Sequence, residues 1–139
     1  MNRADLRLRT WMRAWAPVFA AGGLGFYLLP GMITSNLNRG ARAVGLEESP
    51  VDADNLWIVL AGSYMALITV LCVDAGWTED TRHRRTLARY LVAGKTASSL
   101  GALGYFAFRR RTYAFLANFL LDGAIAAGTY GLLKEAGGD

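Results

Sequence analysis

Lys95 and Asp122 are the two residues whose chemistry stands out, because each lies well inside a long apolar stretch. An ionised side chain in hydrocarbon costs about 2.5 to 3.5 kcal/mol on insertion scales, so such groups are rarely left without a partner. A lysine and a carboxylate in this setting have two uses. They couple the movement of a proton, ion or ligand, or they form an ion pair that locks two helices together. We favour the structural use for a chain of this size.

Other polar residues fall close to these two along the chain. Ser98 and Ser99 follow Lys95 by three and four residues, so at least one of them shares its helical face. Asn118 precedes Asp122 by four residues and stacks on the same side. Two residues near the middle of an earlier apolar segment complete the set. The predicted intramembrane polar site consists of Lys95, Ser98, Ser99, Asn118, Asp122, Ser63 and Tyr64.

Four apolar segments, residues 12–33, 56–74, 87–108 and 113–133, must position these residues. About 20 apolar residues are needed to cross a hydrocarbon core. The first segment has 20 residues without a charged side chain (14–33) and the second has 18 (56–73). The first two also lack the polar stripe that a helix of a soluble bundle needs. The sequence therefore predicts an all-α fold, with residues 1–139 forming one integral membrane domain as an antiparallel bundle of four transmembrane helices.

A depth estimate tests whether the two charged residues meet. The third and fourth segments should form an antiparallel hairpin that turns at residues 109–111. Lys95 lies about 20 Å from the start of this turn, and Asp122 lies about 15 Å from its end, at 1.5 Å per helical residue. The difference is within reach of a flexible lysine side chain. The sequence therefore allows an ion pair between them.

The connection between the first two segments, residues 34–54, has two interpretations. An apolar residue recurs at spacings of 4, 4 and 3 (Ile33, Leu37, Ala41 and Val44), which places these residues on one helical face. A short helix lying in the membrane interface would account for this pattern. An ordinary polar loop is the alternative. Pro30, just before the connection, is expected to kink or end the first helix.

The basic residues suit a lipid surface better than a nucleic acid. The net charge is +4, but the arginines flank the apolar segments and form no stripe along one helix. Nine Lys and Arg residues lie near the two termini and the connection between the second and third segments. Five lie near the other two connections, on the opposite side of the membrane. The positive-inside bias then places both termini in the cytoplasm. The excess of arginine over lysine suggests a bacterial genome, and hence the inner (plasma) membrane.

Several kinds of chemistry are not indicated. Cys72 and His83 are single, so a disulfide framework and a bis-histidine haem site within one chain are excluded. The spacing of Asp74, Glu79, Asp80 and His83 matches no recognised metal-ligand pattern. Neither a nucleophile with a base nor a phosphate-binding loop is present. We therefore expect no catalytic residues, no cofactor and no metal, and not an enzyme.

Short motifs carry a resemblance to known membrane proteins. They are Trp57, Gly62-Ser63-Tyr64-Met65, Gly94-Lys95 with Ser98-Ser99, Asn118-Phe119 and Asp122-Gly123. In this layout the chain resembles small four-helix bacterial membrane proteins without an assigned activity, and it is loosely similar to DoxX-like membrane proteins. The resemblance implies a polar site built on the charged pair, but it brings no activity with it.

Three functions remain open at this point. The leading hypothesis is an accessory, assembly or stabilising subunit of a larger membrane complex, which implies a membrane-protein partner, whereas a homo-oligomer would point to the other two functions. A small oligomeric transporter or channel that uses Lys95 and Asp122 is the alternative. Binding of a lipid or quinone between helices, with Tyr64, Tyr90 or Tyr105 as polar contacts, is the third.

Overall fold

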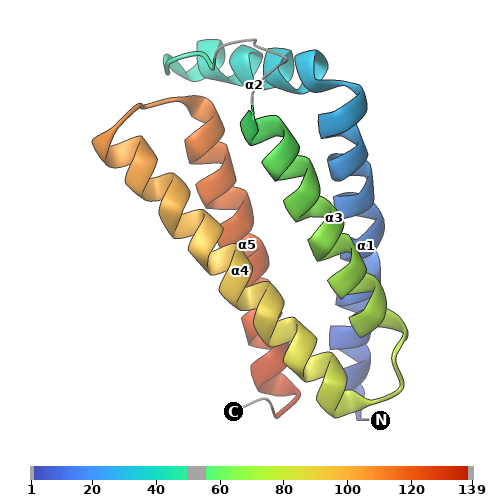
Figure 1. Ribbon diagram of the computed structural model, residues 1–139. Helices are drawn as coiled ribbons and strands as arrows, with labels where there is room; N and C mark the ends of the chain where they lie inside the picture. Colours follow the sequence, from blue (N-terminus) through green and yellow to red (C-terminus); the bar gives the residue numbers. More distant parts are fainter. Residues whose placement is uncertain (1, 50–55, 138–139) are drawn as a thin grey trace.

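The computed structural model describes residues 2–49 and 56–137, and every regular element in these ranges is an α-helix. The helices are α1 (Arg3–Leu28), α2 (Pro30–Val44), α3 (Leu56–Trp77), α4 (Thr81–Phe108) and α5 (Tyr113–Glu135). Four of them run lengthwise, and α2 lies across one end (Figure 1). Both termini and the turn between α3 and α4 lie at the opposite end. The predicted all-α fold is confirmed.

Two helices of the described chain, α3 over Ile58–Trp77 and α5, are long and apolar enough to cross a membrane. The bent pair of α1 and α2 meets the same criteria when the two are taken together, which brings the number to three. The expected third segment corresponds to α4, which is not among them. Lys95, the two serines that follow it and several glycines lower its hydropathy.

The first apolar segment ends earlier than expected. We predicted a helix through residue 33, but α1 ends at Leu28 and α2 begins at Pro30 after a bend of 106°. Proline has no N–H to donate and its ring clashes with the preceding turn, yet it suits the first position of a new helix. The expected break at Pro30 is confirmed. The connection, predicted as residues 34–54, is helical over 34–44, so the loop interpretation is wrong for this part, and its residues 50–54 lie outside the described part of the chain.

The inward face of α2 differs from the predicted apolar face. Thr34, Asn38 and Ala41 are its buried residues, whereas Val44 is exposed. The reason lies in Asn38, whose side chain makes two hydrogen bonds to the main chain of Ser49. Its amide donates to the carbonyl oxygen, and its oxygen accepts from the Ser49 N–H, both at 2.7 Å. A buried asparagine thus fixes the segment that follows α2.

Helix α4 begins six residues before the predicted segment, at Thr81. The carboxylate of Asp80 accepts hydrogen bonds from the N–H groups of Arg82 and His83, at 2.8 and 3.2 Å. It therefore acts as the N-cap. The charged stretch that follows is the first two turns of a helix and not a loop. Helices α3 and α5 begin at the predicted residues, 56 and 113, and end two or three residues beyond the predicted segments.

The long helices pack as two pairs, α1 against α3 and α4 against α5. The core where the pairs meet is concentrated toward the end that holds the termini. Its buried residues are Leu8, Met12, Ala16, Phe19, Ile68, Cys72, Ala75, Ala88, Leu91, Ile125, Leu133 and Ala136. Gly23 of α1 faces α3, and a Cβ there would lie 3.1 Å from the Cβ of Met65. The small residue therefore lets the two backbones approach closely.

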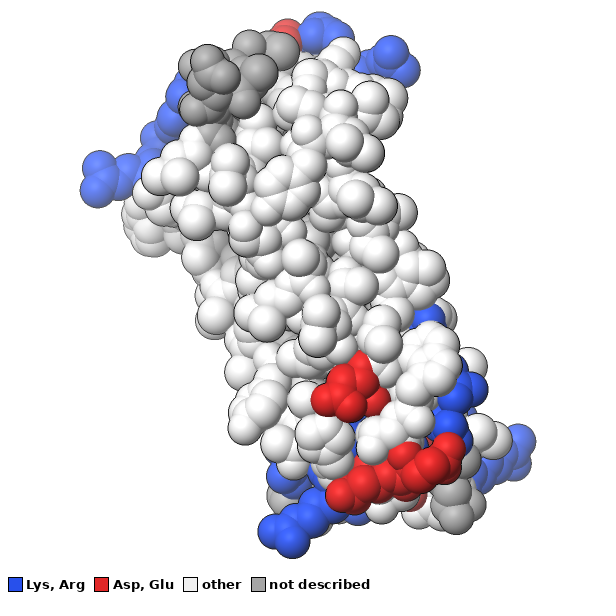
Figure 2. Space-filling view, turned by 45° about the vertical axis from the view of Figure 1, so that its right-hand side comes forward, with Lys and Arg blue, Asp and Glu red and all other residues white. Residues whose placement is uncertain are grey.

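Charged side chains gather at the two ends of the molecule on the face shown in Figure 2, with a broad uncharged belt between them. Large apolar side chains are exposed over the helices, among them Leu28 at 71%, Val70 at 66% and Phe108 at 87%. Large contiguous apolar patches are rare on soluble monomers. This distribution is compatible with a membrane protein.

Candidate functional site

Lys95 and Asp122 form a buried ion pair between α4 and α5. The lysine Nζ lies 2.8 Å from Oδ1 of the aspartate, and the two side chains are 0% and 3% exposed. The contact that the depth estimate allowed is therefore present. At this distance the interaction is a charge-assisted hydrogen bond, the stronger class of such bonds.

Two aromatic rings from the other helix pair enclose the same ammonium group. Its Nζ lies 4.6 Å from the ring centroid of Phe19 on α1 and 5.1 Å from that of Tyr64 on α3. The electron-rich face of an aromatic ring attracts a cation within about 6 Å. Gly94 permits this approach, because a Cβ at that position would lie 3.1 Å from the Tyr64 hydroxyl oxygen. All four long helices thus contribute a side chain to the site.

Two further hydrogen bonds join α4 to α5 in the same antiparallel register. The Ser99 hydroxyl donates to the carbonyl oxygen of Phe119 at 2.8 Å, and the Asn118 amide donates to the hydroxyl of Ser98 at 3.1 Å. The residue numbers in each pair, and in the ion pair, add up to nearly the same value, as antiparallel neighbours must. The polar residues of both helices therefore fix one register for the hairpin.

Ser63 does not join this group, and its predicted membership is wrong. Its side chain is exposed, and its hydroxyl lies 2.8 Å from that of Tyr27 on α1. Successive residues of an α-helix are turned by about 100°, and in α3 this turn directs Ser63 to Tyr27 while Tyr64 lies over Lys95. Tyr64 does reach the ion pair. Its hydroxyl is buried and has no hydrogen-bond partner among the described residues.

The residues weighed for other chemistry lie apart from the pair. Tyr90 and Tyr105 are exposed on α4, so the three tyrosines considered for a quinone are not brought together. His83 lies 2.9 Å from Asp74, and Glu79 pairs with Arg9. Within residues 2–49 and 56–137, no three His, Cys, Asp or Glu side chains gather where they could hold a metal ion.

Sequence reasoning missed a cluster of three arginines at the carboxyl end of α3. Arg84 donates from Nε to the carbonyl oxygen of Ala75 at 3.1 Å and also binds the carbonyl oxygen of Thr78. Arg9 and Arg13 both donate to the carbonyl oxygen of Gly76, at 3.1 and 2.7 Å. The last carbonyl groups of a helix lack partners within it and carry partial negative charge.

Arg84 is the buried member of this arginine cluster, with no exposed surface. Burial, and next the positive charge of Arg9, lower the pKa of Arg84. Its guanidinium stays protonated, because the ordinary pKa of arginine lies far above neutral pH. Arg84 precedes Ala88 by four residues and so shares the buried face of α4, but its contact with the end of α3 depends on the tertiary fold.

The glycines behind the predicted resemblance lie at helix contacts. A Cβ at Gly62 would lie 2.7 Å from the Tyr27 ring, and one at Gly123 would lie 3.0 Å from the Ser99 hydroxyl. The side chain of Trp57 is outside the described part of the structure. Comparisons with protein-family models, with curated proteins and with solved structures give no match for this chain. The resemblance to DoxX-like proteins stays a prediction.

Proposed function

We propose that this chain is a bacterial inner-membrane protein and serves as an accessory, assembly or stabilising subunit of a larger membrane complex. In this proposal α1, α3, α4 and α5 all cross the bilayer, and α2 lies in the interface. The termini and the α3–α4 turn face the cytoplasm, because nine basic residues lie on that side against five on the other. Lys95 does not argue against α4 as a span, since its charge is matched inside the protein.

The observation that carries the proposal is the enclosure of the ion pair by all four long helices. The polar side chains at the centre of the bundle bind one another across helices, so they stabilise the fold. Two surface hollows have volumes of about 410 and 300 Å³, and neither is lined by Lys95 or Asp122, although Phe19 lines the smaller one.

In this proposal the polar residues of the bundle centre stabilise the fold, and the outer surface contacts partner proteins. It carries large apolar side chains, and a Cβ at Gly22, Gly101 or Gly104 would meet no atom within 4 Å. Small residues on an outward face let a partner helix approach closely in a membrane. The apolar surface and these open glycines support a role in assembly with other membrane helices.

Cysteine labelling tests the orientation. The native Cys72 is fully buried and should give little background. Ser35→Cys on exposed α2 should react with a membrane-impermeant maleimide in intact spheroplasts. Glu135→Cys at the other end should react only after lysis, and its lost ion pair with Arg7 is exposed and worth little. If Glu135→Cys reacts in intact spheroplasts and Ser35→Cys reacts only after lysis, the orientation is wrong. If both variants react in intact spheroplasts, or both only after lysis, the four crossings are wrong.

Gentle detergent extraction from the native host tests the accessory role. We expect the tagged chain to be recovered in constant stoichiometry with one or more other membrane subunits, as measured by native mass and by identification of the proteins recovered. Recovery as a monomer without partners would contradict the proposal. Recovery as a homo-oligomer alone would replace it with the transporter alternative.

One observation favours that alternative, a transporter or channel in which two or more protomers enclose a path. The buried Tyr64 hydroxyl has no hydrogen-bond partner among the described residues, and the ring that carries it lies 5.1 Å from the Lys95 ammonium group. In this alternative the hydroxyl passes a proton. In this alternative, Asp122→Asn abolishes transport while the protein still folds. If the site binds a lipid or quinone instead, Asp122→Asn should likewise abolish binding while the protein still folds.

A further inference from the structure

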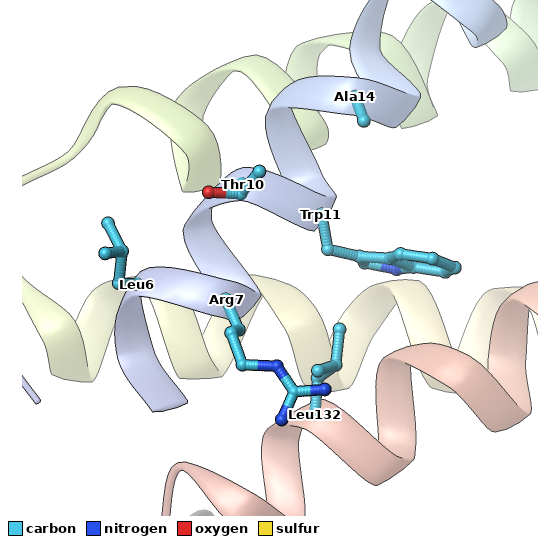
Figure 3. Close-up of a pocket in the computed structure, with 6 residues that line it drawn as sticks. All are labelled: Leu6, Arg7, Thr10, Trp11, Ala14 and Leu132. Carbon is cyan, nitrogen blue, oxygen red and sulfur yellow. The ribbon is translucent and has the colours of Figure 1, made fainter. Parts of the chain in front are cut away.

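A groove lies between α1 and α5 near the end of the molecule that holds the termini (Figure 3). Its volume is about 410 Å³. Sites for small organic ligands start at about 300 Å³. The residues that line it are Leu6, Arg7, Thr10, Trp11, Ala14 and Leu132.

The aromatic wall of this groove is fixed in place. The indole N–H of Trp11 donates to the hydroxyl of Thr129 on α5 at 2.9 Å. Gly128 gives the ring its space, because a Cβ there would lie 3.1 Å from the indole. The tryptophan is therefore held against α5, and the groove is formed before any ligand arrives. Preorganisation of this kind lowers the entropy lost on binding.

Along α1 the polar lining residues Arg7 and Thr10 come before the apolar Ala14, and Leu6 also lies at the charged end. Arg7 and Ala14 are seven residues apart, which is about 10 Å along a helix. The Arg7 side chain is 59% exposed, and one of its nitrogens binds Glu135 at 2.7 Å. A guanidinium has five N–H donors in a planar fork that matches phosphate. The exposed Thr10 hydroxyl lies one turn further along, and the apolar part of the groove follows.

The net positive charge at the end of the molecule that holds the termini favours an anionic ligand. Nine basic residues lie at it, against the acidic residues Asp5, Asp74, Glu79, Asp80 and Glu135 within the described chain. The excess is positive. Anionic lipids attract basic residues near a membrane surface by about 1 kcal/mol each.

We propose that this groove binds an anionic phospholipid. The phosphate group lies at Arg7 and Thr10, and an acyl chain lies along Trp11, Ala14 and Leu132. The inference rests on the membrane insertion proposed above, and it adds a ligand site that the buried ion pair does not supply.

Competition between two lipids tests the site. The purified protein in detergent is mixed with equimolar phosphatidylglycerol and phosphatidylcholine of identical chains, and bound lipids are counted by native mass spectrometry. We expect the wild type to retain phosphatidylglycerol about fivefold over phosphatidylcholine, the ratio that about 1 kcal/mol corresponds to. Arg7→Gln should bring the ratio close to one. Glu135→Gln should raise it, because it removes a competing carboxylate.

Arg3→Gln is the matched control, since it removes the same charge one turn earlier on α1 and does not line the groove. It should keep the preference. Ala14→Phe fills the apolar part and should lower retention of both lipids at unchanged helix content. Absence of a preference in the wild type would overturn the proposal, and so would equal losses in Arg7→Gln and Arg3→Gln.

Carbonate extraction of the membranes shows whether a negative result concerns the lipid site alone or the membrane insertion on which the proposed function depends. If the protein is released by carbonate, membrane insertion itself is wrong. If it stays in the membrane but shows no lipid preference, only the lipid site is wrong.

Discussion

Asp122→Ala is expected to lower the free energy of unfolding by about 3 to 5 kcal/mol, because it leaves the Lys95 ammonium buried without its counter-charge. Lys95→Ala should destabilise the protein for the same reason, since it leaves a buried carboxylate. Titration with SDS in mixed micelles, followed by circular dichroism, measures the loss. Leu121→Ala, at the exposed neighbouring position, is the control and should lie within about 0.5 kcal/mol of the wild type.

Double variants separate a structural from a chemical role of the pair. Lys95→Met with Asp122→Leu removes both charges at similar volume and should recover most of the stability, as replacement of buried ion pairs often does. The exchange Lys95→Asp with Asp122→Lys should recover less. It places a carboxylate where the faces of Phe19 and Tyr64 now attract a cation, a contribution of about 0.5 to 2 kcal/mol.

The behaviour of the apolar double variant decides between the functions. If it is stable and still associates with its membrane partners, the pair is a structural link between α4 and α5. If it is stable but inactive in a transport or ligand assay, the pair carries chemistry and the accessory role is wrong. If both single variants are as stable as the wild type, the pair contributes nothing to the fold.

Arg84→Ala is expected to cost about 3 kcal/mol, the largest effect of a single substitution outside the ion pair. It removes the charge-assisted hydrogen bonds to the main-chain carbonyl groups of Ala75 and Thr78, and such bonds are worth about 1.5 to 3 kcal/mol each. It also leaves a space in a fully buried position. Arg84→Lys should recover only part of the loss, because an ammonium group lacks the planar fork that reaches both carbonyl oxygens. The same SDS titration measures both variants.

Arg82→Ala is the matched control for Arg84. It removes the same charge from the same end of the molecule, but its side chain is exposed. We expect a change within about 0.5 kcal/mol. Both variants lower the count of basic residues by one, so any effect on orientation should be equal. An equal loss of stability in the two would show that Arg84 acts through net charge and not through the end of α3.

The apolar patterning predicted those parts of the fold that burial in lipid or protein dictates. Helices α3 and α5 begin at the expected residues because an uninterrupted apolar run starts there. The contact between Lys95 and Asp122 was accessible to a depth estimate for a related reason. Charges are rare in such segments, so each has few candidate partners.

Features that depend on a particular tertiary neighbour could not be predicted. The helical spacing puts Arg84, and not Arg82, on the buried face of α4, but the bonds that Arg84 makes depend on the position of the α3 end. The two hydrogen bonds of Asn38 depend on where the chain returns after α2. The early start of α4 did have a signal, since Asp80 is a typical N-cap residue. The predicted segment starts only at residue 87, because the charged stretch between Asp80 and that residue is not apolar.

Synthesis of the chain imposes an order on the assembly of this ion pair. Asp122 follows Lys95 by 27 residues, so a ribosome that adds about 5 to 20 residues per second produces the carboxylate about 1 to 5 s after the lysine. Throughout that interval α4 carries an unneutralised charge. Phe19 and Tyr64 belong to α1 and α3, which are translated earlier. The aromatic rings of α1 and α3 are therefore the groups that can contact the Lys95 ammonium before Asp122 has been synthesised.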